Sequence, residues 1–269
     1  MINCAVKSRR RTFAAKINVK ELDRKIRVGA VSYLNTKPLL KGILGSGLTK
    51  DIELTIDYPS RIASMLLTDE IDIGLVPVAI IPEMREYYIN GDYCIGCNGP
   101  VASVCIFSEV PIEKTEKILL DYQSRTSVQL ARVLLREYWN LDPKLEDGGK
   151  DFRDHIKGST AGVVIGDNAL AQRRISPFVY DLGEYWKLLT GLPFVFAAWV
   201  SNKPMEAGFI RAFDAANKAG LGQIDRVVAE NPYSDFDLNA YFTQYLDYKL
   251  DEAKRRGLER FLQYLARNK

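Results

Sequence analysis

Short runs of apolar, β-branched residues alternate with helical segments along this 269-residue chain, and this alternation is the strongest constraint on its fold. The first run covers residues 26–31, and Pro38 then stands where the first turn of a helix would begin, a position that proline favours. Further strands are expected over 52–56 and 71–76, each followed by a helix. Brief connections between such elements predict right-handed βαβ units and a largely parallel sheet.

The alternation stops over residues 93–107, which are rich in glycine, cysteine and small residues, and then resumes. Strands are expected over 117–121, 161–165, 179–182 and 192–200, and the last 65 residues have mostly helical periodicity. This order of elements predicts two α/β lobes, the second inserted into the first. Such a layout resembles the two-lobed periplasmic-binding-protein type II-like fold, in which the ligand lies in a cleft between the lobes. We predict an extension over 1–25, lobe I over 26–108 plus 199–269, and lobe II over 109–198, with crossovers near 108–111 and 198–201.

Composition narrows the class of protein. The chain is 47% hydrophobic and 26% charged, as in ordinary globular proteins, and its net charge of +3 is too small to indicate nucleic-acid binding. No apolar run approaches the roughly 18 residues that a membrane span needs. Without a secretory signal, four cysteines fit a reducing compartment, so we expect a cytoplasmic protein. The basic residues 1–25 are interpreted as an extension outside the main fold, with a docking arm as the alternative.

Metal, redox and triad chemistry have weak support in the sequence. Cys94 and Cys97 form a single CxxC pattern, and we interpret these cysteines as half-buried structural thiols. His155 is the only histidine and lies in a charged segment, where a solvated side chain is expected rather than a general base. The glycine-rich loops that hold nucleotide phosphates are absent. We therefore expect no metal and no cofactor.

Polar side chains follow three predicted strands, at the edge where open α/β sheets bind ligands. Asn35 or Thr36 can cap the first helix or reach this edge. Ser124–Arg125–Thr126–Ser127 opens another helix, either as an ordinary cap or as a carboxylate receptor made of hydroxyls, a guanidinium and free N–H groups. Asp167 follows a buried strand and can cap a helix, orient a cleft side chain or act as a base.

Six ordered motifs together resemble one family, the chorismate dehydratases. They are VSYLNTKPL, DIGLVPVA, GPVASV, SRTS, IGDNAL and TGLPFVFAAW, and they extend from residue 27 to about residue 199. The resemblance implies the two-lobed fold, no metal or cofactor, and a small-molecule substrate without nucleic-acid or membrane partners. It also implies dehydration of chorismate to 3-[(1-carboxyvinyl)oxy]benzoate, the first step of the futalosine route to menaquinone.

The resemblance also implies roles for individual residues. It assigns Asn35 to the chemistry and Ser103 to a substrate contact, Thr126 and Ser127 to substrate carboxylates, and Asp167 to the cleft. Arg125, from the same SRTS segment, joins the expected substrate-binding residues. An amide polarises a departing hydroxyl but cannot take a proton, so we hypothesise that a substrate carboxylate is the base, with Asp167 as the alternative.

Two other functions remain open at this stage. One is the sister enzyme that makes dihydroxynaphthoate later in the same route, which shares the fold but is disfavoured by the SYLN motif. The other is a solute-binding protein without catalytic activity, which would normally carry a secretion signal or lipid anchor.

Overall fold

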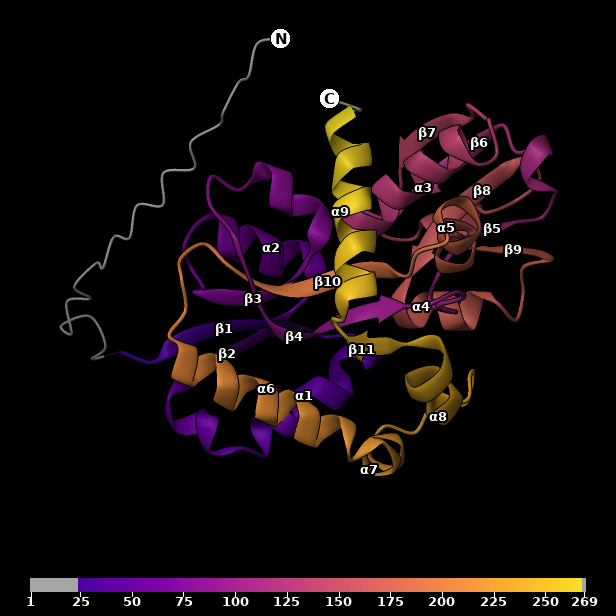
Figure 1. Cartoon of the computed structure of the whole chain (residues 1–269). Helices are drawn as coiled ribbons and strands as arrows, with labels where there is room; N and C mark the ends of the chain where they lie inside the picture. The colour runs from indigo at the N-terminus through magenta and orange to yellow at the C-terminus, as the bar shows by residue number, and fades with distance from the viewer. Residues whose placement is uncertain (1–23, 268–269) are drawn as a thin grey trace, which may run out of the picture.

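The computed structural model describes residues 24–267, which form two mixed β-sheets connected side by side (Figure 1). The six-stranded sheet has the order β11-β4-β10-β3-β1-β2, and the five-stranded sheet has the order β7-β6-β8-β5-β9. We call the first sheet with its helices lobe I and the second lobe II. Most of the predicted extension, residues 1–23, lies outside the described residues.

The strands of lobe I come from both ends of the described chain. They are β1 (Ile26–Val31), β2 (Ile52–Asp57), β3 (Ile73–Pro77), β4 (Tyr88–Cys97), β10 (Phe194–Ser201) and β11 (Asp247–Lys249). Its helical segments are η1 (Leu34–Thr36), α1 (Lys37–Leu44), η2 (Gly47–Lys50), α2 (Pro59–Leu67), η3 (Val78–Glu83), α6 (Ala207–Leu221), α7 (Ile224–Glu230), α8 (Leu238–Ala240), the π-helical turn η6 (Tyr241–Tyr245) and α9 (Glu252–Arg267).

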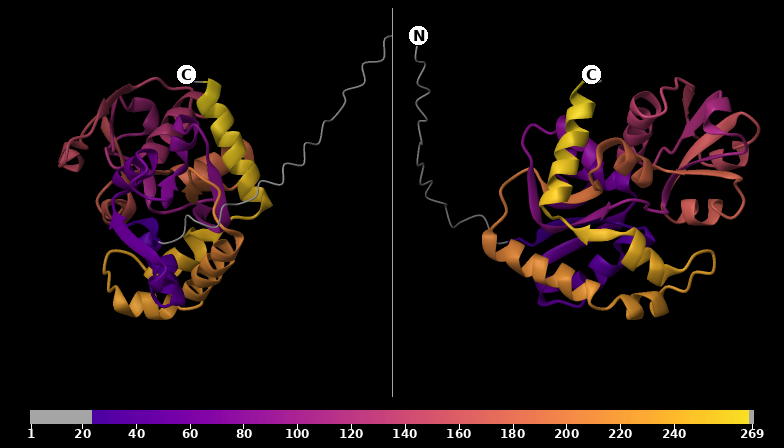
Figure 2. Two further views of the ribbon diagram at one scale, coloured as in Figure 1. Left: turned by 90° about the vertical axis from the view of Figure 1, so that its left-hand side faces the viewer. Right: turned by 45° about the vertical axis from the view of Figure 1, so that its right-hand side comes forward.

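Lobe II is formed by the middle of the chain. Its strands are β5 (Val104–Ser108), β6 (Lys117–Leu120), β7 (Lys144–Asp147), β8 (Thr160–Ile165) and β9 (Phe178–Asp181). Its helical segments are η4 (Ile112–Lys114), α3 (Arg125–Glu137), η5 (Phe152–His155), α4 (Gly166–Gln172) and α5 (Leu182–Thr190). Figure 2 shows the same two lobes from the side and from an oblique angle.

The two-lobed α/β prediction agrees with this architecture, but the prediction of largely parallel sheets was wrong. Parallel pairing is present between β1 and its neighbours β2 and β3, and between β6 and its neighbours β7 and β8. The strands near the crossings, β4, β10 and β5, pair antiparallel with their neighbours. Because β4 leads out of lobe I and β10 leads back into it, the two run in opposite directions without a βαβ connection.

The predicted crossover points are each displaced by one strand. We expected residues 104–108 in lobe I, whereas β5 pairs with β8 and β9 of lobe II. We expected residues 192–198 in lobe II, whereas β10 pairs with β3 and β4 of lobe I. Continuous apolar strands give no local signal of which sheet they join, since every side chain of β5 and β10 is buried.

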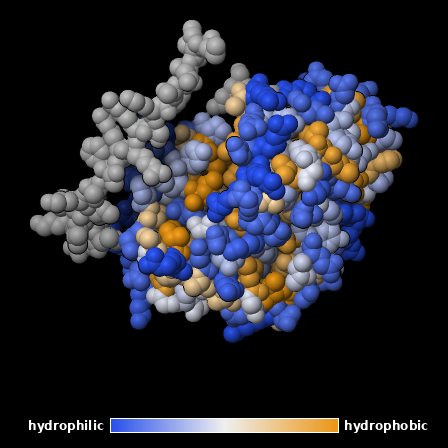
Figure 3. All heavy atoms as spheres, in the orientation of Figure 1, coloured by the Kyte–Doolittle hydropathy of each residue, from blue (hydrophilic) through white to orange (hydrophobic). Residues whose placement is uncertain are grey.

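A hydrophobic core extends through both lobes and includes the fully buried Trp186 of α5 and Trp199 of β10. Helix α9 reinforces the junction because it packs against β10 and η3 of lobe I and against α3 of lobe II (Figure 1). On the face in Figure 3, hydrophobic residues lie in separate areas among hydrophilic ones. Within residues 24–267, every helix is too short or too polar to cross a bilayer.

Candidate active site

A cleft of about 520 Å³ lies where the two lobes meet. Its walls come from the ends of β1, β3 and β8, the N-termini of α2 and α3, and the two crossings between the sheets. The lining residues are Val31, Tyr33, Asn35, Thr36, Pro59, Pro77, Ile95, Val101, Ser103, Val104, Ser124, Thr126, Ser127, Ile165, Gly166, Phe196 and Ala197. That volume includes the solvent-filled space at the open side of the cleft.

Asn35 lies on the lobe I side, in the 3₁₀ turn η1 between β1 and α1. Thr36 occupies the N-cap position of α1, but its side chain does not cap the helix as the sequence suggested. Its hydroxyl instead donates to Oδ1 of Asn35 over 3.1 Å, and the Tyr248 hydroxyl donates to the Asn35 carbonyl over 2.9 Å. These contacts fix the position of the Asn35 side chain and backbone in the cleft wall.

The N-terminus of α3 forms the opposite wall. Ser124 is the N-cap, as predicted, and accepts a hydrogen bond from the Ser127 backbone N–H over 3.2 Å. Thr126 and Ser127 are buried and line the cleft. The Thr126 hydroxyl also accepts a hydrogen bond from Ala79 N–H of lobe I over 3.2 Å. The wall therefore combines hydroxyls with the positive end of a 13-residue helix.

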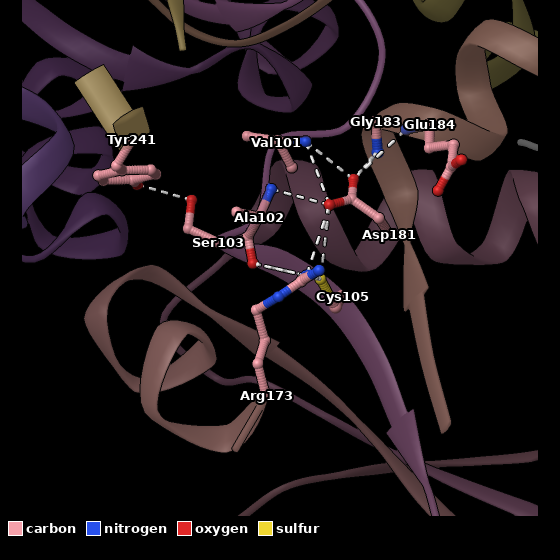
Figure 4. A network of polar contacts seen from close by, with 9 residues as sticks. All are labelled: Val101, Ala102, Ser103, Cys105, Arg173, Asp181, Gly183, Glu184 and Tyr241. Carbon is pink, nitrogen blue, oxygen red and sulfur yellow. Dashed lines mark hydrogen bonds and ion pairs between the residues drawn. The ribbon is translucent and has the colours of Figure 1, made fainter. Parts of the chain in front are cut away.

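Ser103 lies at the first crossing, between β4 and β5. Its hydroxyl accepts a 2.7 Å hydrogen bond from the buried Tyr241 of η6, which belongs to lobe I (Figure 4). Burial raises the pKa of the Tyr241 phenol far above its usual range, while hydrogen bonds to the Ser103 and Asn35 side chains oppose that rise. The phenol is therefore protonated at neutral pH and links two of the predicted site residues.

Two predicted site residues do not line the cleft. Asp167 accepts a hydrogen bond from the Leu34 backbone N–H over 3.1 Å, and Arg125 forms an ion pair with Glu83 at 3.1 Å. Burial raises the pKa of the Asp167 carboxyl, and the bond from Leu34 partly opposes the shift. Both residues belong to lobe II and both partners to lobe I, so these side chains connect the lobes.

Gly166 lets the lobes approach closely at the rim of the cleft. It has φ of +63°, and a Cβ there would lie 3.2 Å from ring carbons of Tyr33 in lobe I. The Tyr33 hydroxyl donates to Oε1 of Gln123, again across the lobes. Burial raises the Tyr33 pKa far above its usual range, and the charge of Asp121 adds to this. The phenol is therefore a neutral donor.

The lining of the cleft is mostly apolar and carries little charge. Of the described residues that line it, none has a carboxylate, ammonium, guanidinium or imidazole group. Hydroxyls, one amide and backbone N–H groups are its polar partners. Such a site recognises anions through hydrogen bonds and helix dipoles rather than through ion pairs.

The cysteines and the histidine lie away from this chemistry. Cys94 and Cys97 are fully buried rather than half-buried as expected, and Cys105 is fully buried as well. Burial raises the pKa of Cys94 to about 12. His155 is exposed in η5, in agreement with the prediction. Within residues 24–267, no group of three or more His, Cys, Asp or Glu side chains is arranged to hold a metal ion.

The structure thus brings four of the six predicted site residues to one cleft from three separate segments: Asn35, Ser103, Thr126 and Ser127. It also adds two tyrosines that sequence reasoning missed. Tyr33 stands inside the SYLN motif, so a signal for it was present. Tyr241 follows a helical, less distinctive region, where no local pattern distinguishes a site tyrosine from a core one.

Comparisons with known proteins agree with this geometry. A family model described as menaquinone biosynthesis matches residues 26–267. The chain is 27% identical over 264 residues to a chorismate dehydratase of Thermus thermophilus, covering 88% of this chain and 94% of that protein. It is 28% identical over 242 residues to a chorismate dehydratase of Campylobacter jejuni, covering 87% and 95%.

Solved structures show the fold. Protein AF1704 of Archaeoglobus fulgidus superimposes with a TM-score of 0.71 at 12% identity, over 91% of this chain and 97% of that one. The CA3427 gene product of Candida albicans, described as having the generic periplasmic-binding-protein fold, superimposes with a TM-score of 0.59 at 13% identity over 89% of each chain. The chain therefore has a periplasmic-binding-protein-like fold, as expected.

Proposed function

Because the chain belongs to the menaquinone-biosynthesis family, we propose that it removes water from chorismate, the activity for which two of its relatives are named. The product is 3-[(1-carboxyvinyl)oxy]benzoate, which would begin the futalosine route to menaquinone. The observation that carries this proposal is a nearly uncharged cleft between the lobes, where Asn35, Ser103 and the α3 N-terminus converge.

Because the described lining of the cleft offers no cation, the carboxylates of chorismate would be bound there by hydrogen-bond donors and a helix dipole. The N-terminus of α3 supplies free N–H groups and the positive end of the helix dipole, with the Thr126 and Ser127 side chains beside them. Each hydrogen bond to a charged group contributes about 1.5–3 kcal/mol. We therefore place one substrate carboxylate at this helix terminus.

The ring then loses the C3 proton and the C4 hydroxyl. The electron pair of the C3–H bond becomes part of the aromatic ring as the C4–O bond breaks, and the proton and hydroxide leave together as water. Aromatisation supplies much of the driving force, so the protein mainly has to orient the substrate and exclude bulk water. The apolar walls from Ile95, Ile165 and Phe196 suit this task.

Asn35 is the proposed catalytic residue. Its amide oxygen accepts from the Thr36 hydroxyl, and an N–H of the amide would stabilise the charge that develops as the substrate hydroxyl departs. An amide cannot accept the C3 proton. The cleft wall lacks a carboxylate or imidazole among the described residues, and Asp167 is engaged with Leu34. These observations favour a carboxylate of the substrate as the base.

Closure of the lobes supports this function. Hydrogen bonds and an ion pair cross between the lobes at Asp167, Arg125, Gln123 and Thr126, around the cleft mouth. In a closed site, water is excluded and each remaining polar contact is stronger because the local dielectric constant is lower. We propose that Arg125 and Asp167 act on the substrate through closure rather than by touching it.

The test is to incubate the purified protein with chorismate and follow the products by chromatography and mass spectrometry. The proposal predicts a product lighter than chorismate by one water, with the ultraviolet spectrum of a substituted benzoate. Calorimetric binding of chorismate without turnover would instead indicate a solute-binding protein. If the protein neither binds nor converts chorismate, the sister activity in dihydroxynaphthoate synthesis becomes the next candidate.

A further inference from the structure

Ser103 is held in a turn whose backbone is strained. Its N–H donates to the Val101 carbonyl over 2.8 Å and closes a three-residue turn around Ala102. Ala102 has φ of +64°, a conformation that residues with a Cβ rarely adopt. Three-residue turns with positive φ are rare and strained, and such strain persists only where the surroundings hold it in place.

The buried carboxylate of Asp181 holds this turn. It accepts hydrogen bonds from Val101 N–H at 3.0 Å and from Ala102 N–H at 2.8 Å (Figure 4). It also caps α5 by accepting from the N–H groups of Gly183 and Glu184 at 3.1 and 3.3 Å. A single carboxylate at the end of β9 therefore connects the cleft turn to the start of a helix.

Arg173 completes the support on the lobe II side. Its Nη1 donates to the Ala102 carbonyl over 3.2 Å and lies 3.7 Å from the Asp181 carboxylate. Both backbone polar groups of the strained residue are thus engaged by side chains that lie more than 70 residues further along the chain.

Tyr241 fixes the side-chain hydroxyl of Ser103. The phenol is fully buried and donates to Ser103 Oγ over 2.7 Å. It comes from a π-helical turn, a rare form that is frequent at functional sites. Tyr241 lies in lobe I whereas Asp181 lies in lobe II, so Ser103 is held from both sides of the cleft.

We propose that Asp181 and Tyr241 are positioning residues that set the place of the Ser103 hydroxyl at the substrate, an inference that rests on the proposed dehydration of chorismate. Asp181 sets the backbone through Val101 and Ala102, and Tyr241 sets the hydroxyl directly. Neither residue lines the cleft, so each would act through a residue that does.

A double-mutant cycle in steady-state kinetics tests this inference. Tyr241→Phe keeps the ring and removes the hydroxyl, and we expect kcat/KM for chorismate to fall about tenfold, the loss of one hydrogen bond. If Tyr241 acts through Ser103, Tyr241→Phe should cost little more in a Ser103→Ala background, because the group it positions is already gone. Equal losses in both backgrounds would overturn the positioning role.

Asp181 is tested by two variants because Asp181→Asn also weakens the cap of α5 and can impair folding. Arg173→Gln leaves that cap intact and removes the guanidinium contacts with Ala102, Cys105 and Asp181. Both variants should lower kcat/KM in the wild-type background and have little effect beside Ser103→Ala. Two matched controls, Tyr180→Phe and Glu206→Gln, should retain wild-type kinetics. The Tyr180 hydroxyl accepts from Ile112 N–H within lobe II, and the Glu206 side chain caps α6.

The outcomes separate the inference from the function it rests on. A wild-type protein that neither binds nor converts chorismate overturns both. An active wild type with unchanged Tyr241→Phe and Arg173→Gln kinetics overturns the inference alone. Losses confined to the unfolding temperature, with kinetics intact, would show that the network serves stability only.

Discussion

The Asp167 carboxylate of lobe II accepts a hydrogen bond from the backbone N–H of Leu34 in lobe I over 3.1 Å. Leu34 directly precedes Asn35, so the contact ties the proposed catalytic amide to the opposite lobe. Asp167, in the first turn of α4, is thus engaged in a contact between the lobes, whereas a proton acceptor would have to face the substrate ring.

Substitutions at Asp167 separate these two roles. Asp167→Asn keeps an oxygen that can accept from Leu34, and we expect kcat close to that of the wild type. Asp167→Ala removes the acceptor, and we expect KM to rise about tenfold, since closure loses a hydrogen bond to a charged group. Steady-state kinetics of both variants decide the matter. A loss of orders of magnitude in kcat for Asp167→Asn would make Asp167 the base.

Asn35 is expected to act in the transition state. Asn35→Ala should lower kcat by about 10²–10³ with much less effect on KM, as other single-donor deletions do. Asn35→Asp should be at least as impaired, because a negative charge is added beside an anionic substrate. Single-turnover and steady-state rates give the measurement. An Asn35→Asp variant faster than wild type would rule out proton removal by the substrate.

The carboxylate receptor at α3 predicts a binding defect. Ser127→Ala removes a cleft hydroxyl and should raise KM tenfold or more, as expected for a lost bond of about 1.5–3 kcal/mol to a charged group. Thr126→Ala should do the same and also loosen closure, because Thr126 accepts from Ala79 across the lobes. Thr126→Ser keeps the hydroxyl and serves as the control. Wild-type KM values in both alanine variants would leave only a capping role for this segment.

Asp72 is expected to make the free energy of unfolding depend on pH. Burial raises the pKa of its carboxyl, but hydrogen bonds from the Arg24 and Arg27 side chains and the Arg27 N–H outweigh burial and hold that pKa well below its ordinary 3.8. The pKa of Asp72 is lower in the folded protein than in the unfolded chain. Its contacts with the arginines therefore stabilise the fold fully at pH values above the unfolded pKa, and this stabilisation is lost as the pH falls towards the folded pKa.

We expect Asp72→Asn to lower the free energy of unfolding by about 1.5–3 kcal/mol at neutral pH. The difference from wild type should shrink below pH about 4, where the unfolded carboxyl takes up a proton. Urea unfolding of both proteins between acid and neutral pH gives the measurement. A difference that stays constant throughout that range would contradict the assignment.

The crossing of α1 and α6 depends on Gly42. A Cβ there would lie 1.8 Å from the Ala216 carbonyl oxygen, which is backbone and cannot swing away. Although alanine favours a helix over glycine by about 1 kcal/mol, we expect Gly42→Ala to destabilise the fold by about 1–3 kcal/mol through overpacking. Gly47→Ala, with open space around it, is the control for thermal unfolding. A more stable Gly42→Ala variant would show that the helices separate easily.

Much of the fold followed from local sequence patterns. The strand of residues 26–31 and the Ser124 cap of α3 were found in the structure because apolar period, proline and capping preferences act over a few residues. Helix α4 begins at Gly166, directly after β8, and α2 begins at Pro59. The edge strands β7 and β11 were missed, since each has four residues or fewer.

The sequence by itself determined which segments bring polar groups to strand ends, because a break from apolar to polar residues is encoded locally. Tertiary structure decided which of those groups face the same cavity. It turned Asp167 and Arg125 towards lobe contacts, and it brought Tyr241 against Ser103 across 138 residues of chain. It also decided the sheet membership of β5 and β10. These outcomes depend on long-range packing of buried surfaces, which no short window of sequence contains.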